Sequence, residues 1–160
     1  LTISQKVDPT PGQLRIAVTR QLRTVLNRYI KAARRKLEQM SRRSFCTQTW
    51  TMKLAEFPSE ITLPYPPFQS VSSFTYIDID DVSQSVGASE YTVLDTALPA
   101  RIILSYDGEW PTHRQQRDGI TLAWVAGYGL AVAVPDEIKQ AITLLAAHWY
   151  EQREPIVTGR

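Results

Sequence analysis

The spacing of apolar positions changes twice along the chain. From about Pro11 to Ser41 apolar residues recur every three or four positions, as they do on one face of an amphipathic helix. Thr10 can cap such a helix, and a proline such as Pro11 suits its first turn. The pattern predicts one long helix, or two shorter ones that meet between Gly12 and Thr19. The recurring residues are Val18, Leu22, Val25, Leu26, Tyr29, Ala33, Leu37 and Met40.

The middle of the chain alternates between apolar and polar residues, which is typical of half-buried strands. Asp80 and Asp81 are expected to form the turn of a hairpin, because aspartate is favoured at such tips. The prolines between 64 and 67 stop further pairing, and the run Gly127, Tyr128, Gly129 ends the series of strands. The expected strands are residues 46–54, 61–63, 71–79, 82–86, 91–94, 101–104 and 118–126.

Helical spacing returns after Pro135, with Asp136 and Glu137 favourably placed in the first turn. The order of elements predicts an α+β fold with an inserted block of antiparallel strands. In it the two helices pack together, and their apolar faces form the core. The second helix is expected to end before Pro155. Its buried stripe is predicted to consist of Ile138, Ile142, Leu145 and Trp149, with Ala141, Leu144 and His148 alongside.

The length of 160 residues and the hydrophobic content of 43% predict one domain with a core of its own. We divide residues 1–160 into a basic helical region (11–45), a β-rich insertion (46–129), a C-terminal helix (135–154) and a flexible tail (155–160). No apolar run approaches the roughly 20 residues that span a membrane, and no secretory signal pattern is visible. A single cysteine, Cys46, excludes a disulfide within the chain.

The formal charge of +2 hides an asymmetry, because the stretch from Gln13 to Phe45 contains ten basic residues and a single acidic one, Glu38. The helical wheel places five of them opposite the apolar stripe. Such a face can meet a partner or another copy of the chain, be merely solvated, or lie along DNA phosphates. The candidate interface residues are Arg20, Arg23, Lys31, Arg34, Arg35, Arg42, Arg43, Pro155, Ile156 and Val157.

Signatures of enzymes are absent from the sequence, so no catalytic residue, cofactor or metal site is predicted. Asp78, Asp80 and Asp81 are the best candidates for a metal or acid-base site, and a hydrolase built on them is an alternative. The turn interpretation is preferred for these aspartates. His148 is expected to be a buried or partner-facing structural residue rather than a catalytic base.

Four tryptophans are expected to anchor the core or an interface: Trp50, Trp110, Trp124 and Trp149. Together with Gly127, Tyr128 and Gly129, they are the structural residues that the sequence singles out. Strand aromatics in an oligonucleotide-binding barrel would look similar. A sequence-independent nucleic-acid-binding module that uses the basic helix is therefore the alternative function.

Several short runs, taken in order and spacing, resemble the family of phage head-tail connector (adaptor) proteins, which also occur in gene transfer agents. The resemblance covers about residues 34–154. The chain departs from the family pattern at 40–44, where a Thr-Gly-Arg-like turn is common, and its N-terminal segment is more basic. The matching runs are 47–50 (TQTW), 61–67 (ITLPYPP), 69–73, 76–78, 91–93, 101–102, 110–111, 125–129 (VAGYG), 134–135, 138–142 and 148–151.

This resemblance implies a structural role without enzymatic activity. Such proteins form a ring, expected to be a dodecamer, that joins the portal to a stopper or other tail-proximal neck protein and extends the DNA channel. Packaged DNA would pass through the ring, and no membrane is involved. The protein would lie in the neck of a virion or phage-like particle that is assembled in the bacterial host cytoplasm. The basic helix would serve contacts with other copies, the portal or the channel, and the tail after Pro155 would order on binding.

Overall fold

The computed structural model describes residues 11–152, with side chains described from Thr19 onward. The chain divides into two compact units. The first, which we call the helical unit, comprises Leu1–Leu37 and Asp136–Arg160. The second, which we call the β unit, comprises Glu38–Pro135. The predicted tail, with Pro155, Ile156 and Val157, lies outside the described residues.

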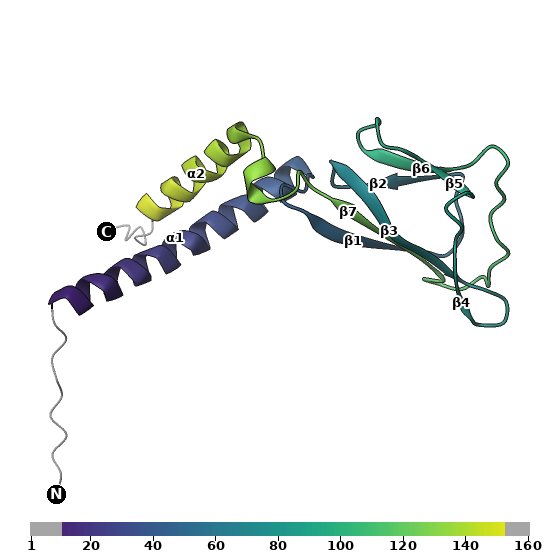
Figure 1. Cartoon of the computed structure of the whole chain (residues 1–160), viewed down its shortest axis with the longest axis horizontal. Helices are drawn as coiled ribbons and strands as arrows, with labels where there is room; N and C mark the ends of the chain where they lie inside the picture. The colour runs from purple at the N-terminus through teal and green to yellow at the C-terminus, as the bar shows by residue number, and fades with distance from the viewer. Residues whose placement is uncertain (1–10, 153–160) are drawn as a thin grey trace, which may run out of the picture. The chain divides into compact units, whose positions relative to one another are not determined.

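The helical unit contains helices α1 (Pro11–Ser41), whose last turn belongs to the β unit, and α2 (Asp136–Glu151) (Figure 1). α1 is continuous, so the break considered between Gly12 and Thr19 does not occur. The two helices contact each other where the rings of Tyr29 and Tyr150 meet edge to face, with centroids 6.1 Å apart. The predicted α+β class, with an antiparallel strand block inserted between two helices in the sequence, is confirmed.

The apolar faces of the helices are only partly covered. The predicted buried stripe of α1 includes Leu22 and Leu26, yet these side chains are 43% and 37% exposed. On α2, Leu144 is 65% exposed and His148 is exposed as well, which excludes the buried position considered for His148 and leaves the partner-facing one. The expectation that these faces form the core is wrong, because two helices can cover only one side of each other.

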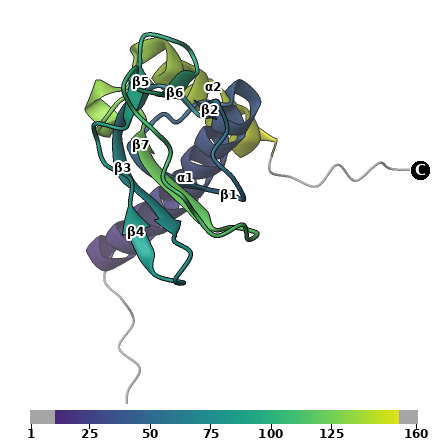
Figure 2. The same ribbon diagram turned by 90° about the vertical axis from the view of Figure 1, so that its right-hand side faces the viewer.

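The β unit contains two antiparallel sheets (Figures 1 and 2). The first has the order β1-β7-β3-β4, and the second has the order β2-β6-β5. The strands of the first sheet are β1 (Gln48–Leu54), β7 (Ile120–Ala126), β3 (Phe68–Ile77) and β4 (Ser83–Ser85). Those of the second are β2 (Glu60–Leu63), β6 (Ala100–Leu104) and β5 (Tyr91–Leu94).

Every predicted strand is present, and all ends but one lie within two residues of those expected. The main difference is β3, which begins at Phe68 rather than at residue 71. A short 3-10 helix, η1 (Ala131–Ala133), was not predicted and lies between the last strand and α2. The predicted hairpin is confirmed, because β3 pairs with β4 across the turn that contains Asp80 and Asp81.

The core of the protein lies between the two sheets of the β unit. β7 alternates strictly, and its inward residues Ile120, Leu122, Trp124 and Ala126 are at most 2% exposed. The opposing sheet contributes Ile102, which is fully buried, together with its neighbours on β2 and β6. Burying one such aliphatic side chain stabilises the fold by about 1.5–3 kcal/mol. The sandwich therefore supplies most of the apolar burial of the described chain.

Candidate interaction surface

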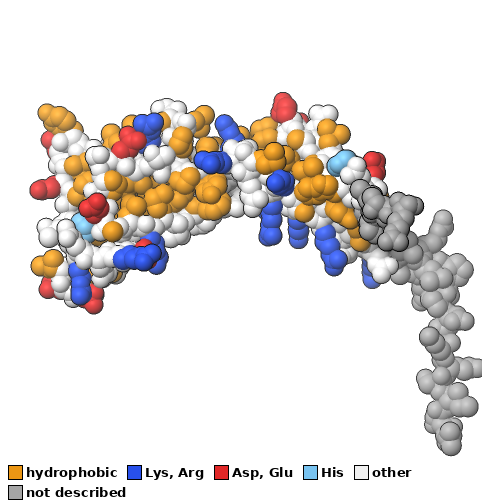
Figure 3. Space-filling view, turned by 180° about the vertical axis from the view of Figure 1, so that it is seen from behind, with side chains coloured by type: hydrophobic (Ala, Val, Ile, Leu, Met, Phe, Trp, Pro, Cys, Tyr) orange, Lys and Arg blue, Asp and Glu red, His pale blue; other side chains and the backbone are white. Residues whose placement is uncertain are grey.

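The basic residues of α1 form a row along one side of the helix. Arg20, Arg23, Lys31 and Arg35 are exposed, and Arg34 is half-buried and takes part in a further interaction. The row covers about 22 Å of helix, at ~1.5 Å per residue. Figure 3 shows Lys and Arg side chains projecting side by side from the helical unit. The structure thus brings together the five basic residues singled out in the sequence.

The exposed cations of this row are not paired with nearby acids. In residues 19–152 none of the exposed basic side chains of α1 makes an ion pair or hydrogen bond. The helix's one acid in this range, Glu38, is engaged elsewhere: its Oε1 accepts hydrogen bonds from the Phe45 amide (3.0 Å) and Gln48 Nε2 (2.9 Å). Uncompensated charges of one sign raise the local potential and attract an anionic partner.

An aliphatic ridge lies beside the basic row. Leu22, Leu26 and Ile30 follow each other at intervals of four residues and are 37–46% exposed. Residues three or four positions apart are neighbours on a helix, so Arg23 adjoins Leu26. Arg23, Asn27 and Lys31 follow one another at intervals of four residues on the same side. The surface is therefore mixed, with apolar and positively charged strips side by side. Mixed strips of this kind are common in protein interfaces, where arginine is enriched.

Arg42 and Arg43 lie past the end of the row. Arg42 is exposed in a left-handed conformation (φ 51°) directly after α1. Arg43 is half-buried, and its Nη1 donates a hydrogen bond to the Tyr128 hydroxyl at 3.2 Å. The structure therefore separates these two candidates from the other basic residues, and it gives Arg43 and Tyr128 a contact within the β unit.

The residues around Gly127 join the segment that enters β1 to the segment that leaves β7. Gly127 has a φ of 126°, and a Cβ atom there would overlap the Cys46 carbonyl. The Gly127 amide donates to the Pro67 carbonyl at 2.8 Å, and the Gly129 carbonyl accepts from the Thr47 amide at 3.0 Å. The predicted end of the last strand is therefore also a junction of three segments.

Two of the tryptophans sit in stacked aromatic pairs. Trp50 lies 4.0 Å from Tyr65 between ring centroids, and its Nε1 donates to Ser44 Oγ at 2.8 Å. Trp110 stacks on Phe57 with centroids 4.8 Å apart. Trp124 is buried in the core, whereas Trp149 of α2 is half-buried. None of the four presents a fully exposed ring on which a base could stack.

Asp78 organises the hairpin turn that the sequence predicted. Its Oδ1 accepts hydrogen bonds from the amides of Asp80 (3.0 Å) and Val82 (2.9 Å), and its Oδ2 accepts from Gln84 Nε2 (3.0 Å). The Val82 amide, and then Gln84, lower the pKa of Asp78. Asp81 pairs with Arg114 at 3.0 Å. Among the described residues no three His, Cys, Asp or Glu side chains are placed to hold a metal.

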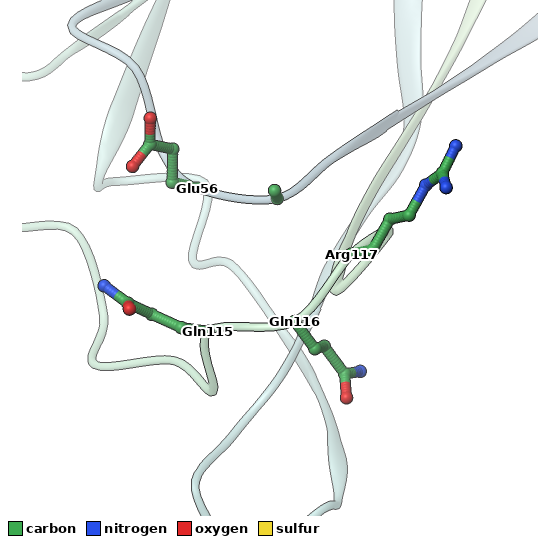
Figure 4. A pocket seen from close by; sticks show the side chains of 5 residues that line it. Glu56, Gln115, Gln116 and Arg117 are labelled. Atoms are coloured by element: carbon green, nitrogen blue, oxygen red, sulfur yellow. The ribbon is translucent and has the colours of Figure 1, made fainter.

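A shallow polar pocket lies between the turn after β1 and the loop before β7 (Figure 4). It is lined by Ala55, Glu56, Gln115, Gln116 and Arg117. The labelled side chains point away from one another rather than toward a common point. A catalytic site needs an acid or base and its partner within hydrogen-bonding reach, so this pocket offers no such arrangement.

The sequence did not predict the apolar tip of the β3–β4 hairpin. Ile79 and Val82, on either side of Asp80 and Asp81, are 69% and 50% exposed. Both residues had been assigned to strands, where one face would be covered, whereas β3 ends at Ile77 and β4 begins at Ser83. An aliphatic residue next to an aspartate pair was the available signal for an exposed tip.

No helix in residues 11–152 is long and apolar enough to cross a membrane. No protein-family model and no curated protein sequence matches this chain. Solved structures do match it. A chain in the neck of an empty GTA particle, computed with C6 symmetry, is 24% identical, with a TM-score of 0.70 over 84% of this chain and 69% of that one.

Two further structures share the fold. A chain in the virion of a native gene transfer agent (GTA) particle is 22% identical, with a TM-score of 0.70 over 86% of this chain and 71% of that one. A chain in the neck of a native GTA particle, computed with C12 symmetry, is 23% identical, with a TM-score of 0.69 over 99% of this chain and 88% of that one. The resemblance indicated by the sequence motifs is therefore confirmed in the architecture: this chain has the fold of a protein of the gene transfer agent neck.

Proposed function

We propose that this protein is a structural subunit of the neck of a tailed phage or phage-like particle, where it assembles into a ring. The observation that carries the proposal is the match to a chain in a GTA neck computed with C12 symmetry, which extends over 99% of this chain. The ring is a closed assembly in which one surface of each subunit binds a different surface of the next.

Within that neck the protein acts as an adaptor between the portal and the next neck or tail protein, and its ring extends the channel for DNA. No enzymatic step is part of this role. The described surface supports the proposal, because its prominent features are exposed charged and aliphatic strips on α1 rather than converging polar groups. Such strips are suited to binding macromolecules.

Purified full-length protein, imaged by electron microscopy alone and with the portal of the same particle, is expected to form rings. Particles labelled with an antibody against this chain should carry the label at the junction of head and tail. Monomers under both conditions, or label on the capsid or tail tip, would contradict the proposal.

The basic row of α1 is proposed to make the assembly contacts, together with Arg42, Arg43 and the tail residues Pro155, Ile156 and Val157. Replacing all five residues of the row by serine should abolish ring formation or portal attachment, because it removes the exposed positive charge of α1. The circular dichroism spectrum and melting temperature should change little. Serine at Lys53 and Arg117, exposed basic residues of the β unit, is the control and should leave assembly intact. The row is Arg20, Arg23, Lys31, Arg34 and Arg35.

A sequence-independent nucleic-acid-binding module is the second candidate, favoured by the exposed cations of α1. Binding to phosphates releases counterions, so its affinity would fall steeply as salt rises. Fluorescence anisotropy with a short duplex DNA distinguishes the two. Salt-dependent binding by monomers at physiological ionic strength favours the module, and its absence beside intact ring assembly favours the adaptor.

A further inference from the structure

We propose that the basic row and aliphatic ridge of α1 bind the β3–β4 hairpin tip, residues 79–82, of a neighbouring copy. The inference rests on the proposed ring and names the two surfaces that meet within it. The contact joins the helical unit of one subunit to the β unit of the next. It therefore repeats around the ring, and no unit binds the same unit of another copy.

The distribution of charge favours this pairing. Within residues 11–152 the helical unit contains nine basic and three acidic residues, whereas the β unit contains six basic and eleven acidic residues. Two helical units placed against each other would repel, and so would two β units. Alternation of the units places opposite potentials together, which speeds encounter and disfavours wrong registers.

The chemistry of the hairpin tip matches that of α1. Ile79 and Val82 expose aliphatic surface, and Asp80 beside them is exposed and makes no side-chain hydrogen bond or ion pair with a described residue. Asp81 pairs with Arg114, but both side chains remain at least half exposed. The tip thus carries aliphatic groups beside carboxylates, as α1 carries an aliphatic ridge beside cations.

The tip is also held in shape before binding. Asp78 accepts hydrogen bonds from Asp80, Val82 and Gln84, and these contacts fix the turn between the two strands. A preorganised loop loses less conformational entropy on binding than a flexible one. Asp78 therefore supports the contact as a positioning residue while Asp80 and Asp81 face the partner.

Protein is a better occupant for α1 than DNA because of the aliphatic ridge. Leu22, Leu26 and Ile30 adjoin the row and would gain nothing from phosphates. Packed against Ile79 and Val82 of a neighbouring copy, these side chains would be removed from contact with water. The cations beside them would then pair with the carboxylates of the hairpin tip. The contact combines apolar burial with ion pairs, so it weakens with salt without disappearing.

Charge reversal on each surface, and on both together, tests the pairing. One variant carries Arg23→Glu and Lys31→Glu, a second carries Asp80→Lys with Asp81→Asn, and a third carries all four changes. Asparagine is chosen because Asp81 has a φ of 66°, which asparagine tolerates. Ring content is measured by mass photometry and electron microscopy, and folding by circular dichroism and melting temperature.

The matched control is Lys36→Glu with Lys53→Glu. It changes the net charge by the same amount at two exposed lysines, one on α1 that the helical wheel places away from the row and one on β1. Like charges placed face to face are strongly unfavourable, so each reversed surface should raise the half-assembly concentration by about tenfold or more. The combined variant should return toward the wild-type value, and the control should stay near it.

The alternative outcomes separate this inference from the proposed function. Rings that form normally in all variants overturn the inference and leave the neck assignment standing. Loss of rings in the combined variant as well as in the single-surface variants shows that α1 meets another surface, which also overturns it. Binding of a short duplex DNA that depends on Arg23 and Lys31, beside intact rings, makes nucleic acid the occupant. Wild-type protein that forms no ring, even with the portal, overturns both proposals.

Discussion

The two units of this chain differ in how far their apolar residues are buried. The β unit buries Ile102, Leu122 and Trp124 between two sheets, so that they are at most 2% exposed. The helical unit leaves Leu26 and Leu144 accessible to water. A sandwich has two inner faces that cover each other, whereas a pair of helices leaves part of each apolar stripe open. The β unit holds most of the buried apolar residues, and the helical unit has apolar surface left for assembly.

Polar groups follow the same division. In the β unit, side chains satisfy nearby backbone, as Asp78 does in its hairpin turn and Glu38 does with the Phe45 amide. On α1, exposed cations have no partner among the described residues. Groups that are paired within the chain fix its shape, and unpaired charges remain available for another molecule.

The largest expected effect distinguishes the core from the helical surface. Leu122→Ala should reduce the free energy of unfolding by about 2–5 kcal/mol, because it opens a cavity in a fully buried site. Leu144→Ala, the same deletion on an exposed helix, should stay within about 0.5 kcal/mol. Urea unfolding followed by tryptophan fluorescence measures both. If both variants of the monomeric protein lost the same free energy of unfolding, Leu144 would be packed as tightly as Leu122. The difference in burial between the two units would then be refuted.

A smaller effect is expected at the segment junction of the β unit. Gly127→Ala imposes backbone strain of about 1–3 kcal/mol at φ 126° and adds an overlap with the Cys46 carbonyl. Gly129→Ala imposes similar strain at φ 115°, but its Cβ would meet only Ala133 at 3.5 Å. Thermal unfolding should therefore show the lower melting temperature for Gly127→Ala. The reverse order would show that the junction is looser than its hydrogen bonds indicate.

The smallest expected effect depends on pH. Hydrogen bonds hold the pKa of Asp78 below its usual value of 3.8. Because this pKa is lower in the folded than in the unfolded state, the ionised carboxylate stabilises the fold. The stabilisation is complete above the pKa of the unfolded state and is lost as the pH falls through the pKa of the folded state. Asp78→Asn should remove that acid-dependent part. Urea midpoints between about pH 6 and about pH 2 measure it, and NMR titration of Asp78 with a midpoint at or above 3.8 would contradict the assignment.

Local signals predicted the elements of the fold well. Pro11 marks the start of α1, Pro135 directly precedes α2, and strict alternation marked β7. The position of the core was predicted wrongly, because periodicity shows which face of a helix is apolar but not how much of it a partner covers. The pairing of β1 with β7 joins residues about 70 positions apart, and no local pattern contains that information.

The candidate surface was predicted in part. The basic row follows from helical geometry, and the structure shows that Arg20, Arg23, Lys31 and Arg35 are exposed together. The hydrogen bond between Arg43 and Tyr128 could not be foreseen, since it joins residues 85 positions apart. The exposure of Ile79 was missed because alternation extends a strand past the point where the turn begins.

The position of β7 has a consequence for how the chain is made. β1 and β3 do not pair with each other, and each pairs with β7, the last strand in sequence. During synthesis β1 therefore emerges long before its only neighbour, and the first sheet closes once residue 126 has left the ribosome. Such distant pairing slows folding, and the nascent chain carries β1 with unpaired edges until residues 120–126 emerge.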